Sequence, residues 1–397
     1  MAELYSLPDG WEWRTLGEIG KLFSGSSAPQ KDEYFIDGKY PFIRTKDLST
    51  YGRTDNLIEV NDYINDKCIN DSSLILAKKG TVLFPKSGAS IGTNNRAKIG
   101  INAYIVSHLG AFYSKEEVIN KYVYNYFLTI DLLDYCENPS YPSLKISRVK
   151  EIEIPLPPLE EQKRIVAKLD ILFAKIDKAI ALHQKNCEEA DIFMASVLND
   201  VFVELEEKYE KKQLNQIVIF GGKNISTLEY PNLIYFSLED IETQTGKILN
   251  YKTVNESGVK GTAVSFDDNV VLYSKLRPYL NKVIVPNLEG CATTELVVLK
   301  PKDKLDKYFL ASYLRSSNIV SFLNNDSMGA KMPRTNMKTF RNLDIPLPPL
   351  KTQQKVVSYL DEISNKIEKI KQIQKEKMQS LKALKASILD KAFKGEL

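Results

Sequence analysis

The stretch Ile154–Phe202, IPLPPLEEQKRIVAKLDILFAKIDKAIALHQKNCEEADIFMASVLNDVF, returns later in the chain as Ile345–Phe393, IPLPPLKTQQKVVSYLDEISNKIEKIKQIQKEKMQSLKALKASILDKAF. The two copies align without a gap at an offset of 191 residues, and 17 of 49 positions are identical. Each copy begins with a proline-rich hexapeptide and continues as a long helical pattern. A repeat of this length in a chain of 397 residues indicates two similar halves.

The sequence before each copy also follows one pattern twice. In the first half, short apolar runs separated by Gly, Asn, Asp and Ser are typical of strands, and a helical spacing follows within Lys115–Leu133. In the second half, Val270–Lys275 (VVLYSK) matches Thr81–Lys86 (TVLFPK), and Asp306–Leu323 is again helical. The offset between matching blocks changes by a few residues, which indicates a shared fold with divergent loops. We therefore predict an α+β chain with two similar domains.

The helical part of each copy contains a continuous seam of positions spaced by three and four residues. A seam kept over about four heptads is typical of a coiled coil, and ~45 helical residues form a rod of roughly 65–70 Å. We predict that the two helices pack antiparallel with pseudo-two-fold symmetry. The residues expected to mediate helix pairing are Leu169, Ile176, His183, Asn186 and Phe193 in the first helix, and Leu360, Ile367, Gln374, Lys377 and Leu384 in the second.

Both seams become polar at the same two central positions, His183 with Asn186 and Gln374 with Lys377. We expect these residues near the midpoint of the rod, where a polar seam residue fixes the register of the pairing. A ligand-binding or catalytic role for His183 is the alternative. A long amphipathic helix is often part of a domain core, but these helices are too long for a domain of ordinary size.

The composition is that of an ordinary folded protein, with 43% hydrophobic and 10% aromatic residues. The formal net charge is +3, so any affinity for nucleic acid must come from local basic segments. No apolar run reaches the ~18–20 residues that cross a bilayer, and we expect no membrane partner. The four cysteines have no metal-ligand spacing and, without an export signal, indicate reduced thiols in the cytoplasm.

Sequence signatures of catalysis are missing. The chain lacks the GxxxxGK[ST] phosphate loop, the HExxH motif and paired Cys/His spacings, and its histidines are His108 and His183. We therefore predict no catalytic residue, no metal site and no cofactor in this chain. An enzyme in its own right, such as a nuclease or a methyltransferase, is the function class that the sequence supports least.

Each half contains two segments that carry lysine and arginine but no acidic residue, at 72–115 and 138–150 and again at 269–288 and 327–343. A charge run is usually only a solvated face. Its occurrence at equivalent places in both halves favours a surface for DNA phosphates and bases. The candidate DNA-binding residues are Lys78, Lys79, Lys86, Ser87, Asn94, Asn95, Arg96, Lys98, Lys145 and Arg148 in the first half, and Lys275, Arg277, Tyr279, Lys282, Lys331, Arg334, Asn336 and Lys338 in the second.

The chain resembles the specificity subunits of type I restriction–modification systems. The resemblance rests on LPDGWEWRTLGEI at Leu7–Ile19, on the motifs IPLPPLEEQKRIV and IPLPPLKTQQKVV, and on ASILDKAFKGEL at Ala386–Leu397, and it covers the whole length. It implies target-recognition domains at residues 1–158 and 213–349, each reading one half of a bipartite asymmetric DNA site. It also implies spacer helices at residues 159–212 and 350–397 that set the distance between half-sites.

The same resemblance implies a non-catalytic subunit that takes part in defence against foreign DNA. Its expected partners are double-stranded DNA, two methyltransferase subunits and two restriction subunits, with S-adenosylmethionine, ATP and Mg held by those subunits. Lys351 and Thr352 replace Glu160 and Glu161 in the second motif, which leaves open whether the two methyltransferase contacts are equivalent. The alternative is a two-domain coiled-coil adaptor without DNA readout, and a sequence-specific footprint distinguishes the two.

Overall fold

The computed structural model describes residues 5–138, 141–329 and 331–397. Residues 139, 140 and 330, which belong to two of the predicted DNA-binding segments, lie outside the described residues. The chain forms two compact units: unit 1 is Met1–Leu182 with Lys377–Leu397, and unit 2 is His183–Glu376.

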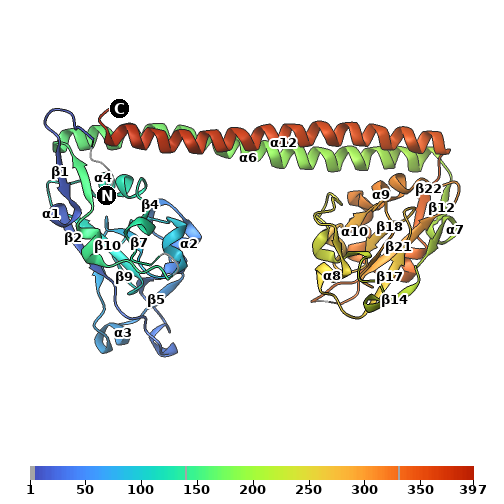
Figure 1. The fold of residues 1–397 in the computed structure, drawn as a ribbon, viewed down its shortest axis with the longest axis horizontal. Helices are drawn as coiled ribbons and strands as arrows, with labels where there is room; N and C mark the ends of the chain where they lie inside the picture. Colours follow the sequence, from blue (N-terminus) through green and yellow to red (C-terminus); the bar gives the residue numbers. More distant parts are fainter. Residues whose placement is uncertain (1–4, 139–140, 330) are drawn as a thin grey trace. The chain divides into compact units, whose positions relative to one another are not determined.

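Two long helices take part in both units. They are α6 (Leu159–Lys208, 50 residues) and α12 (Leu350–Phe393, 44 residues), and each begins directly after its proline motif. The division between the units falls within both helices, beside the polar positions His183 and Lys377. The chain is thus an α+β protein with two similar domains and two long paired helices, each unit holding one domain and a portion of both helices (Figure 1).

Unit 1 has two sheets and a two-stranded ribbon within its described residues. The sheets have the strand orders β2-β10-β7-β8-β4 and β5-β3-β9-β6. Pairing is antiparallel except for β3 with β9 and β4 with β8. The ribbon pairs β1 with β11, which the first proline motif forms. The strands are β1 (Glu12–Thr15), β2 (Gly20–Ser24), β3 (Tyr40–Ile43), β4 (Thr54–Leu57), β5 (Asp62–Ile64), β6 (Leu76–Ala77), β7 (Val82–Pro85), β8 (Ala97–Ile99), β9 (Ala103–Ile105), β10 (Leu109–Ser114) and β11 (Glu153–Leu156).

Short helices complete unit 1, with α4 beside the long helices and α3 at the far end of the domain (Figure 1). They are α1 (Leu16–Ile19), α2 (Thr45–Tyr51), α3 (Asp66–Asp71), α4 (Asn120–Phe127) and α5 (Ile146–Lys150), with 3-10 turns η1 (Asp32–Tyr34), η2 (Ala89–Thr93) and η3 (Leu132–Tyr135). The helical spacing seen across residues 115–133 therefore yields a shorter helix, α4, because the chain leaves the helix at Leu128 and re-forms as η3.

Unit 2 repeats this arrangement with the sheet orders β13-β21-β18-β19 and β14-β17-β20-β15-β16 and the ribbon β12-β22, in its described residues. As in unit 1, a central parallel pair, here β15 with β20, lies within an otherwise antiparallel sheet. The strands are β12 (Lys211–Gln213), β13 (Val218–Phe220), β14 (Asn224–Ser226), β15 (Ile234–Phe236), β16 (Lys252–Thr253), β17 (Thr262–Phe266), β18 (Val271–Ser274), β19 (Val283–Ile284), β20 (Gly290–Ala292), β21 (Leu296–Pro301) and β22 (Asp344–Pro346).

The helical segment predicted at Asp306–Leu323 is two helices, because Ser316 adopts an extended conformation between them. Its hydroxyl donates to the Tyr313 carbonyl oxygen at 2.8 Å, a local bond that competes with helix continuation. The helices and 3-10 turns of unit 2 are α7 (Leu214–Ile217), α8 (Val254–Ser257), α9 (Lys307–Arg315), α10 (Ser317–Asn325), α11 (Met337–Arg341), η4 (Thr227–Glu229), η5 (Leu238–Asp240) and η6 (Pro278–Leu280).

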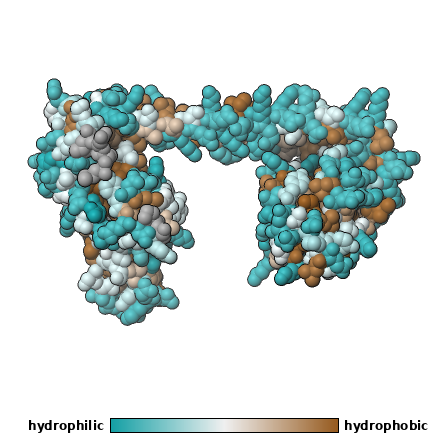
Figure 2. Space-filling view, in the orientation of Figure 1, coloured by the Kyte–Doolittle hydropathy of each residue, from teal (hydrophilic) through white to brown (hydrophobic). Residues whose placement is uncertain are grey.

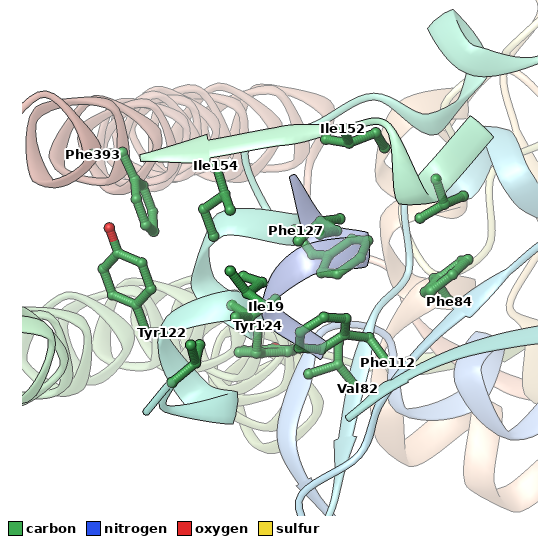
Figure 3. Close-up of a cluster of buried hydrophobic side chains, with 14 of the residues drawn as sticks. Ile19, Val82, Phe84, Phe112, Tyr122, Tyr124, Phe127, Ile152, Ile154 and Phe393 are labelled. Carbon is green, nitrogen blue, oxygen red and sulfur yellow. The ribbon is translucent and has the colours of Figure 1, made fainter. Parts of the chain in front are cut away.

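The last turns of α12 belong to the core of unit 1. Phe393 packs edge-on against Tyr122 and Tyr126 of α4, with ring centroids 5.1 Å apart in both pairs. Figure 3 shows Phe393 facing Tyr122 across the end of this core, with Ile154 of the proline motif next to them. Aromatic pairs of this kind stabilise the fold beyond the contribution of the apolar area they bury. The end of α12 is therefore packed stably against the domain of unit 1.

The last turns of α6 make the same contact in unit 2. Phe202, which is 191 positions before Phe393, packs edge-on against Phe309 at 5.3 Å and Tyr313 at 5.1 Å. Phe202 is 2% exposed, like Phe393. Both copies of the repeat therefore end in a phenylalanine that packs against a helix of the domain, α4 in unit 1 and α9 in unit 2. This shared contact explains why the residue is identical in the two copies.

The two long helices run antiparallel within each unit. In unit 1, Lys385 Nζ lies 2.8 Å from an Asp177 carboxylate oxygen. In unit 2, His183 Nδ1 lies 2.5 Å from Gln374 Oε1, and Lys371 accepts the Cys187 thiol hydrogen at its carbonyl oxygen. The contact between His183 and Gln374 places a polar pair between the two helices, and its role in fixing the register stays a prediction.

The predicted seam holds at some positions and shifts at others. Leu169, Ile176, Leu360 and Ile367 are buried. Phe193 and Leu384 are instead 54% and 48% exposed, and Asn186 and Lys377 are exposed as well. Phe193, Leu384 and Lys377 therefore do not form the buried seam that their spacing predicted. Asn186 is exposed as well, but its Nδ2 donates to Gln374 Oε1 of the other helix at 3.4 Å, so it takes part in the pairing.

The residues that replace them come one position later in each helix. Cys187 is buried, and Met194, Met378 and Lys385 are half-buried. A straight α-helix has 3.6 residues per turn, so a strict repeat of seven drifts by about 20° per heptad. After two heptads the inward face has moved to the following residue, and the strict heptad spacing no longer describes the contact.

Candidate DNA interface

The two acid-free segments of the first domain meet at the end of β7. The Lys86 amide donates to the His108 carbonyl oxygen at 3.0 Å, and the Leu144 amide donates to the Lys86 carbonyl oxygen at 2.8 Å. Ser87 forms an antiparallel bridge with Ser143. We call this pairing of residues 86–88 with residues 142–144 the strand-end junction of unit 1.

The second domain forms the same strand-end junction at the end of β18, between residues 275–277 and 333–335. The Lys275 amide donates to the Glu295 carbonyl oxygen at 3.0 Å, and the Thr335 amide donates to the Lys275 carbonyl oxygen at 2.8 Å. Leu276 forms an antiparallel bridge with Arg334. The two domains therefore hold their acid-free segments together by matching backbone bonds.

Several predicted DNA-binding residues gather at these junctions. Lys86 and Ser87 of unit 1 and Lys275 of unit 2 are half-buried. Arg277 of unit 2 is exposed. Arg277 has φ of 52°, an unusual left-handed conformation for a long side chain, and its amide donates to the Pro333 carbonyl oxygen at 2.7 Å. Backbone bonds therefore hold Arg277 in a strained conformation at the junction, a feature that tends to mark functional sites.

The first helical residues after each junction carry further candidates. Lys145 is the N-cap of α5, and Asn336 is the N-cap of α11, where its side chain accepts from the Lys338 amide at 3.1 Å. Lys338, Lys331 and Arg148 are exposed. Tyr279 of η6 is 44% exposed.

Some of the predicted residues lie at the opposite end of β7. Lys98 stands opposite Val82 at the start of that strand, and the Lys79 amide donates to Asn102 Oδ1 at 2.8 Å. Burial lowers the pKa of Lys98, although the Asp55 carboxylate opposes this effect. Lys78, Lys79 and Lys98 thus form a group separate from the strand-end junction.

Arg96 is a correction to the predicted DNA-binding set. Its side chain is fully buried, where the guanidinium donates to the Asn95 carbonyl oxygen and to Asn94 Oδ1, both at 2.8 Å. Burial lowers the pKa of Arg96 to about 10. Asn94 has φ of 53°, so the arginine supports a left-handed turn from inside and is not presented to DNA. An acid-free segment shows charge but not the direction of a side chain.

Other candidates are engaged within the domain. Lys282 Nζ donates to the Leu238 carbonyl oxygen at 2.6 Å, and burial lowers its pKa. Lys145 pairs with Glu137 at 2.7 Å, and Arg334 pairs with Glu295 at 2.8 Å. The hydrogen bond with Glu295 raises the pKa of Arg334. These side chains need to release or share a partner to contact DNA.

A buried glutamine joins each long helix to its domain. Gln162 Nε2 donates to the Pro157 carbonyl oxygen at 2.9 Å and to the Glu117 carbonyl oxygen at 3.4 Å. Its Oε1 accepts from the amide of Ile119, the N-cap of α4, at 3.0 Å. We call this side chain the glutamine latch of unit 1.

Unit 2 has the same glutamine latch at Gln353, which is fully buried. Nε2 donates to the Pro348 carbonyl oxygen at 2.8 Å and to the Lys304 carbonyl oxygen at 2.9 Å, and Oε1 accepts from the Asp306 amide at 2.8 Å. The latches were missed in the sequence because a glutamine in a helix is usually exposed. The available signal was the identity of this residue in both proline motifs.

Neither a metal-binding cluster nor a membrane-spanning helix is found in the described part of the chain. No group of three or more His, Cys, Asp and Glu side chains in residues 5–138, 141–329 and 331–397 is arranged to hold a metal ion. Over the same residues, no helix combines the length and apolar character needed to cross a membrane.

Known proteins are similar to this chain in sequence and in fold. The family model for the type I restriction modification DNA specificity domain matches residues 8–186 and 206–377. The EcoDI type I restriction enzyme specificity subunit of Escherichia coli is 25% identical over 429 residues, covering 98% of this chain and 89% of that protein. The MjaIX specificity subunit of Methanocaldococcus jannaschii is 32% identical over 177 residues, covering 43% of this chain and 39% of that protein.

Two solved structures show the same fold. A chain from work on complex assembly and conformational transition of the type I R-M system has a TM-score of 0.73 at 22% identity, with 99% of this chain and 100% of that chain covered. The HsdS subunit from Thermoanaerobacter tengcongensis has a TM-score of 0.55 at 23% identity, with 100% and 99% covered. Because the family model matches residues 8–186 and 206–377, which make up most of the chain, this chain belongs to the type I restriction–modification DNA specificity subunit family.

Proposed function

We propose that this chain is the non-catalytic subunit that reads a bipartite asymmetric DNA site, with one half-site bound by each domain. The observation that carries the proposal is the duplicated strand-end junction. Matching backbone bonds hold Lys86 in one domain and Lys275 in the other, while the neighbouring side chains differ. A common backbone with different side chains suits two modules that grip DNA in the same way and read different bases.

We also propose that the long helices carry the partner subunits. On the face that Figure 2 shows, the helices are mostly hydrophilic, with isolated apolar spots. Ile192, Phe193, Ile370 and Leu384 are between 46% and 69% exposed on these helices. A partner subunit that covers these side chains would remove their apolar area from water, which stabilises association. The partners are two methyltransferase subunits with S-adenosylmethionine, and two restriction subunits with ATP and Mg, acting in the cytoplasm.

The proposed spacer function has a mechanical consequence. Removing one heptad within Asp170–Asn199 and its counterpart within Asp361–Asp390 shortens both helices by about 10 Å. The separation of the half-sites should change while each half-site sequence is kept, as read by methylome sequencing of cells that express the assembled methyltransferase. A change in the half-site sequences themselves would contradict the spacer function.

The DNA-reading function is tested with the assembled methyltransferase. Binding of the specific duplex is measured over a range of salt concentrations for the wild-type chain, Lys86→Ala and Lys275→Ala. Each substitution should weaken binding and reduce the salt slope by about one, because a phosphate contact releases about one counterion. Lys223→Ala, an exposed lysine outside the junction, is the control. Unchanged binding for both junction variants would contradict the assignment.

The alternative function is a coiled-coil adaptor that binds proteins without reading DNA. The exposed apolar residues of α6 and α12 fit that function equally well. The two functions differ in one measurement, because only the DNA reader gives the assembled complex a sequence-specific footprint. A complex that forms but protects no specific sequence would support the adaptor.

A further inference from the structure

The strand-end junctions of the two units share a lysine, Lys86 or Lys275, and a proline, Pro142 or Pro333, and differ at their other positions. One difference sets Gly88 of unit 1 against Arg277 of unit 2. Another sets Ser143 against Arg334, and the residue whose carbonyl oxygen accepts from the junction lysine is His108 in unit 1 and Glu295 in unit 2. His108 and Glu295 match because their carbonyl oxygens accept the junction lysine amide, and Ser143 and Arg334 match because both form the bridge between the segments. The backbone is shared, so a difference in what the two junctions recognise comes from the side chains that differ, and among these Arg334 is the one that a carboxylate, Glu295, holds.

The backbone of Arg334 is held on both sides. Its amide donates to the Met328 carbonyl oxygen and its carbonyl oxygen accepts from the Met328 amide, both at 2.8 Å. The bridge to Leu276 holds the other edge. A side chain that leaves a fixed backbone loses less conformational freedom when it binds a ligand, so the position favours recognition.

The side chain of Arg334 is both exposed and oriented. It is 52% exposed, and its Nη2 donates to Glu295 Oε1 at 2.8 Å. A guanidinium has five N–H donors, so this bond leaves donors for a second partner. Holding one side of the planar group by a carboxylate fixes its orientation, which a bidentate contact requires.

Glu295 has no evident reason to stand on a basic surface other than to hold Arg334. Its carboxylate repels DNA phosphates, and the two segments that flank it here, residues 269–288 and 327–343, contain no acidic residue. Its side chain is 26% exposed, and Oε2 is buried without a hydrogen-bond partner in the described residues. The carboxylate therefore has Oε1 bonded to Arg334 and Oε2 shielded from solvent.

We infer that Arg334, oriented by Glu295, reads a guanine in the half-site bound by unit 2. Arginine donates to the O6 and N7 atoms of guanine in the major groove, the commonest specific contact between a side chain and a base. The half-site bound by unit 1 lacks this contact, because Ser143 stands in the arginine position and His108 pairs with Ser87 at 2.6 Å. Lys275, which matches Lys86, contacts a phosphate. The inference rests on the proposed DNA-reading function and names one of its base contacts.

The test uses the assembled methyltransferase and a library of duplexes in which each position of the bipartite site is varied in turn. The chains compared are the wild type, Arg334→Ala, Arg334→Lys, Glu295→Gln and Lys275→Ala. Arg334→Ala should reduce the preference for guanine at one position of one half-site by about tenfold or more. Arg334→Lys keeps the charge and loses the planar fork, so it should also lose most of that preference. Glu295→Gln should reduce it less than Arg334→Ala.

The other half-site is the internal control for folding and assembly, and its preferences should be unchanged in all variants. Lys275→Ala should weaken every duplex alike and lower the salt slope by about one. The inference is overturned if Arg334→Ala weakens every duplex alike with a lower salt slope, since that identifies a phosphate contact, or if the guanine preference persists. A wild-type complex without any sequence preference would instead contradict the proposed function.

Discussion

Replacing Gln353 by leucine removes the glutamine latch of unit 2 while keeping a side chain of similar volume. Three hydrogen bonds are lost, at 2.8, 2.9 and 2.8 Å, and the side chain that makes them is fully buried. A neutral hydrogen bond contributes about 1 kcal/mol net, and a buried partner left without one costs about 1–3 kcal/mol. We expect unit 2 to lose roughly 3–5 kcal/mol of unfolding free energy.

Gln354→Leu is the matched control, because it makes the same chemical change one residue later, at an exposed position. Its effect should stay within about 0.5 kcal/mol. Urea unfolding measures the total effect. Amide hydrogen exchange locates the effect. Exchange should accelerate in α9, because the amide of its N-cap Asp306 donates to Gln353 Oε1, and it should be unchanged in α4 of unit 1.

The reasoning is refuted if Gln353→Leu and Gln354→Leu are equally stable, or if α4 and α9 lose protection together. Equal stability would mean that solvent satisfies the latch partners once the glutamine is gone. Loss of exchange protection in both helices would mean that the latch stabilises the whole chain. It would then not act only on the contact between one long helix and its domain.

Three further predictions concern the cores and the corrected residue. Phe393→Ala should lower the unfolding free energy of unit 1 by about 3–5 kcal/mol, as measured by urea unfolding. Phe193→Ala is the control, because Phe193 is exposed, and its effect should stay below about 0.5 kcal/mol. Equal effects of the two substitutions would contradict the packing described. Burial raises the pKa of Tyr122 and Tyr313, so their stabilisation is complete below about pH 10, the unfolded value, and is lost as the pH rises through the folded values. Absorbance at the tyrosinate band should show a class of tyrosines that ionises only on unfolding, and a single titration near the ordinary pKa would contradict this. Arg96→Met should change the unfolding free energy and leave the salt slope of DNA binding as in the wild type, whereas a slope lowered by about one would show that Arg96 contacts a phosphate after all.

The repeat made most of the architecture predictable. Two copies of one pattern mean two similar halves, and a proline motif followed by an uninterrupted helical pattern means an extended strand leading into a helix. The structure has β11 and α6 in one half and β22 and α12 in the other, as that pattern implies. These features depend on the backbone conformations that short stretches of residues prefer, and those preferences can be read from the sequence.

The helix seam was predictable only in part. Leu169 and Ile176 are buried because they lie close to the start of the pairing, whereas Phe193 is exposed because the inward face had drifted by then. The heptad spacing describes a supercoiled pair, and the drift depends on how far the two helices bend around each other. That bending is a property of the pair and not of either sequence.

The candidate DNA interface shows the same limit. The sequence by itself determined that each half carries two acid-free basic segments, since composition is local. Only the tertiary structure decided that these segments meet at the strand-end junctions, that Arg96 points into the core, and that Gln162 and Gln353 are buried latches. The direction of a side chain depends on which strands pair around it, and those pairings join residues that lie far apart in the chain.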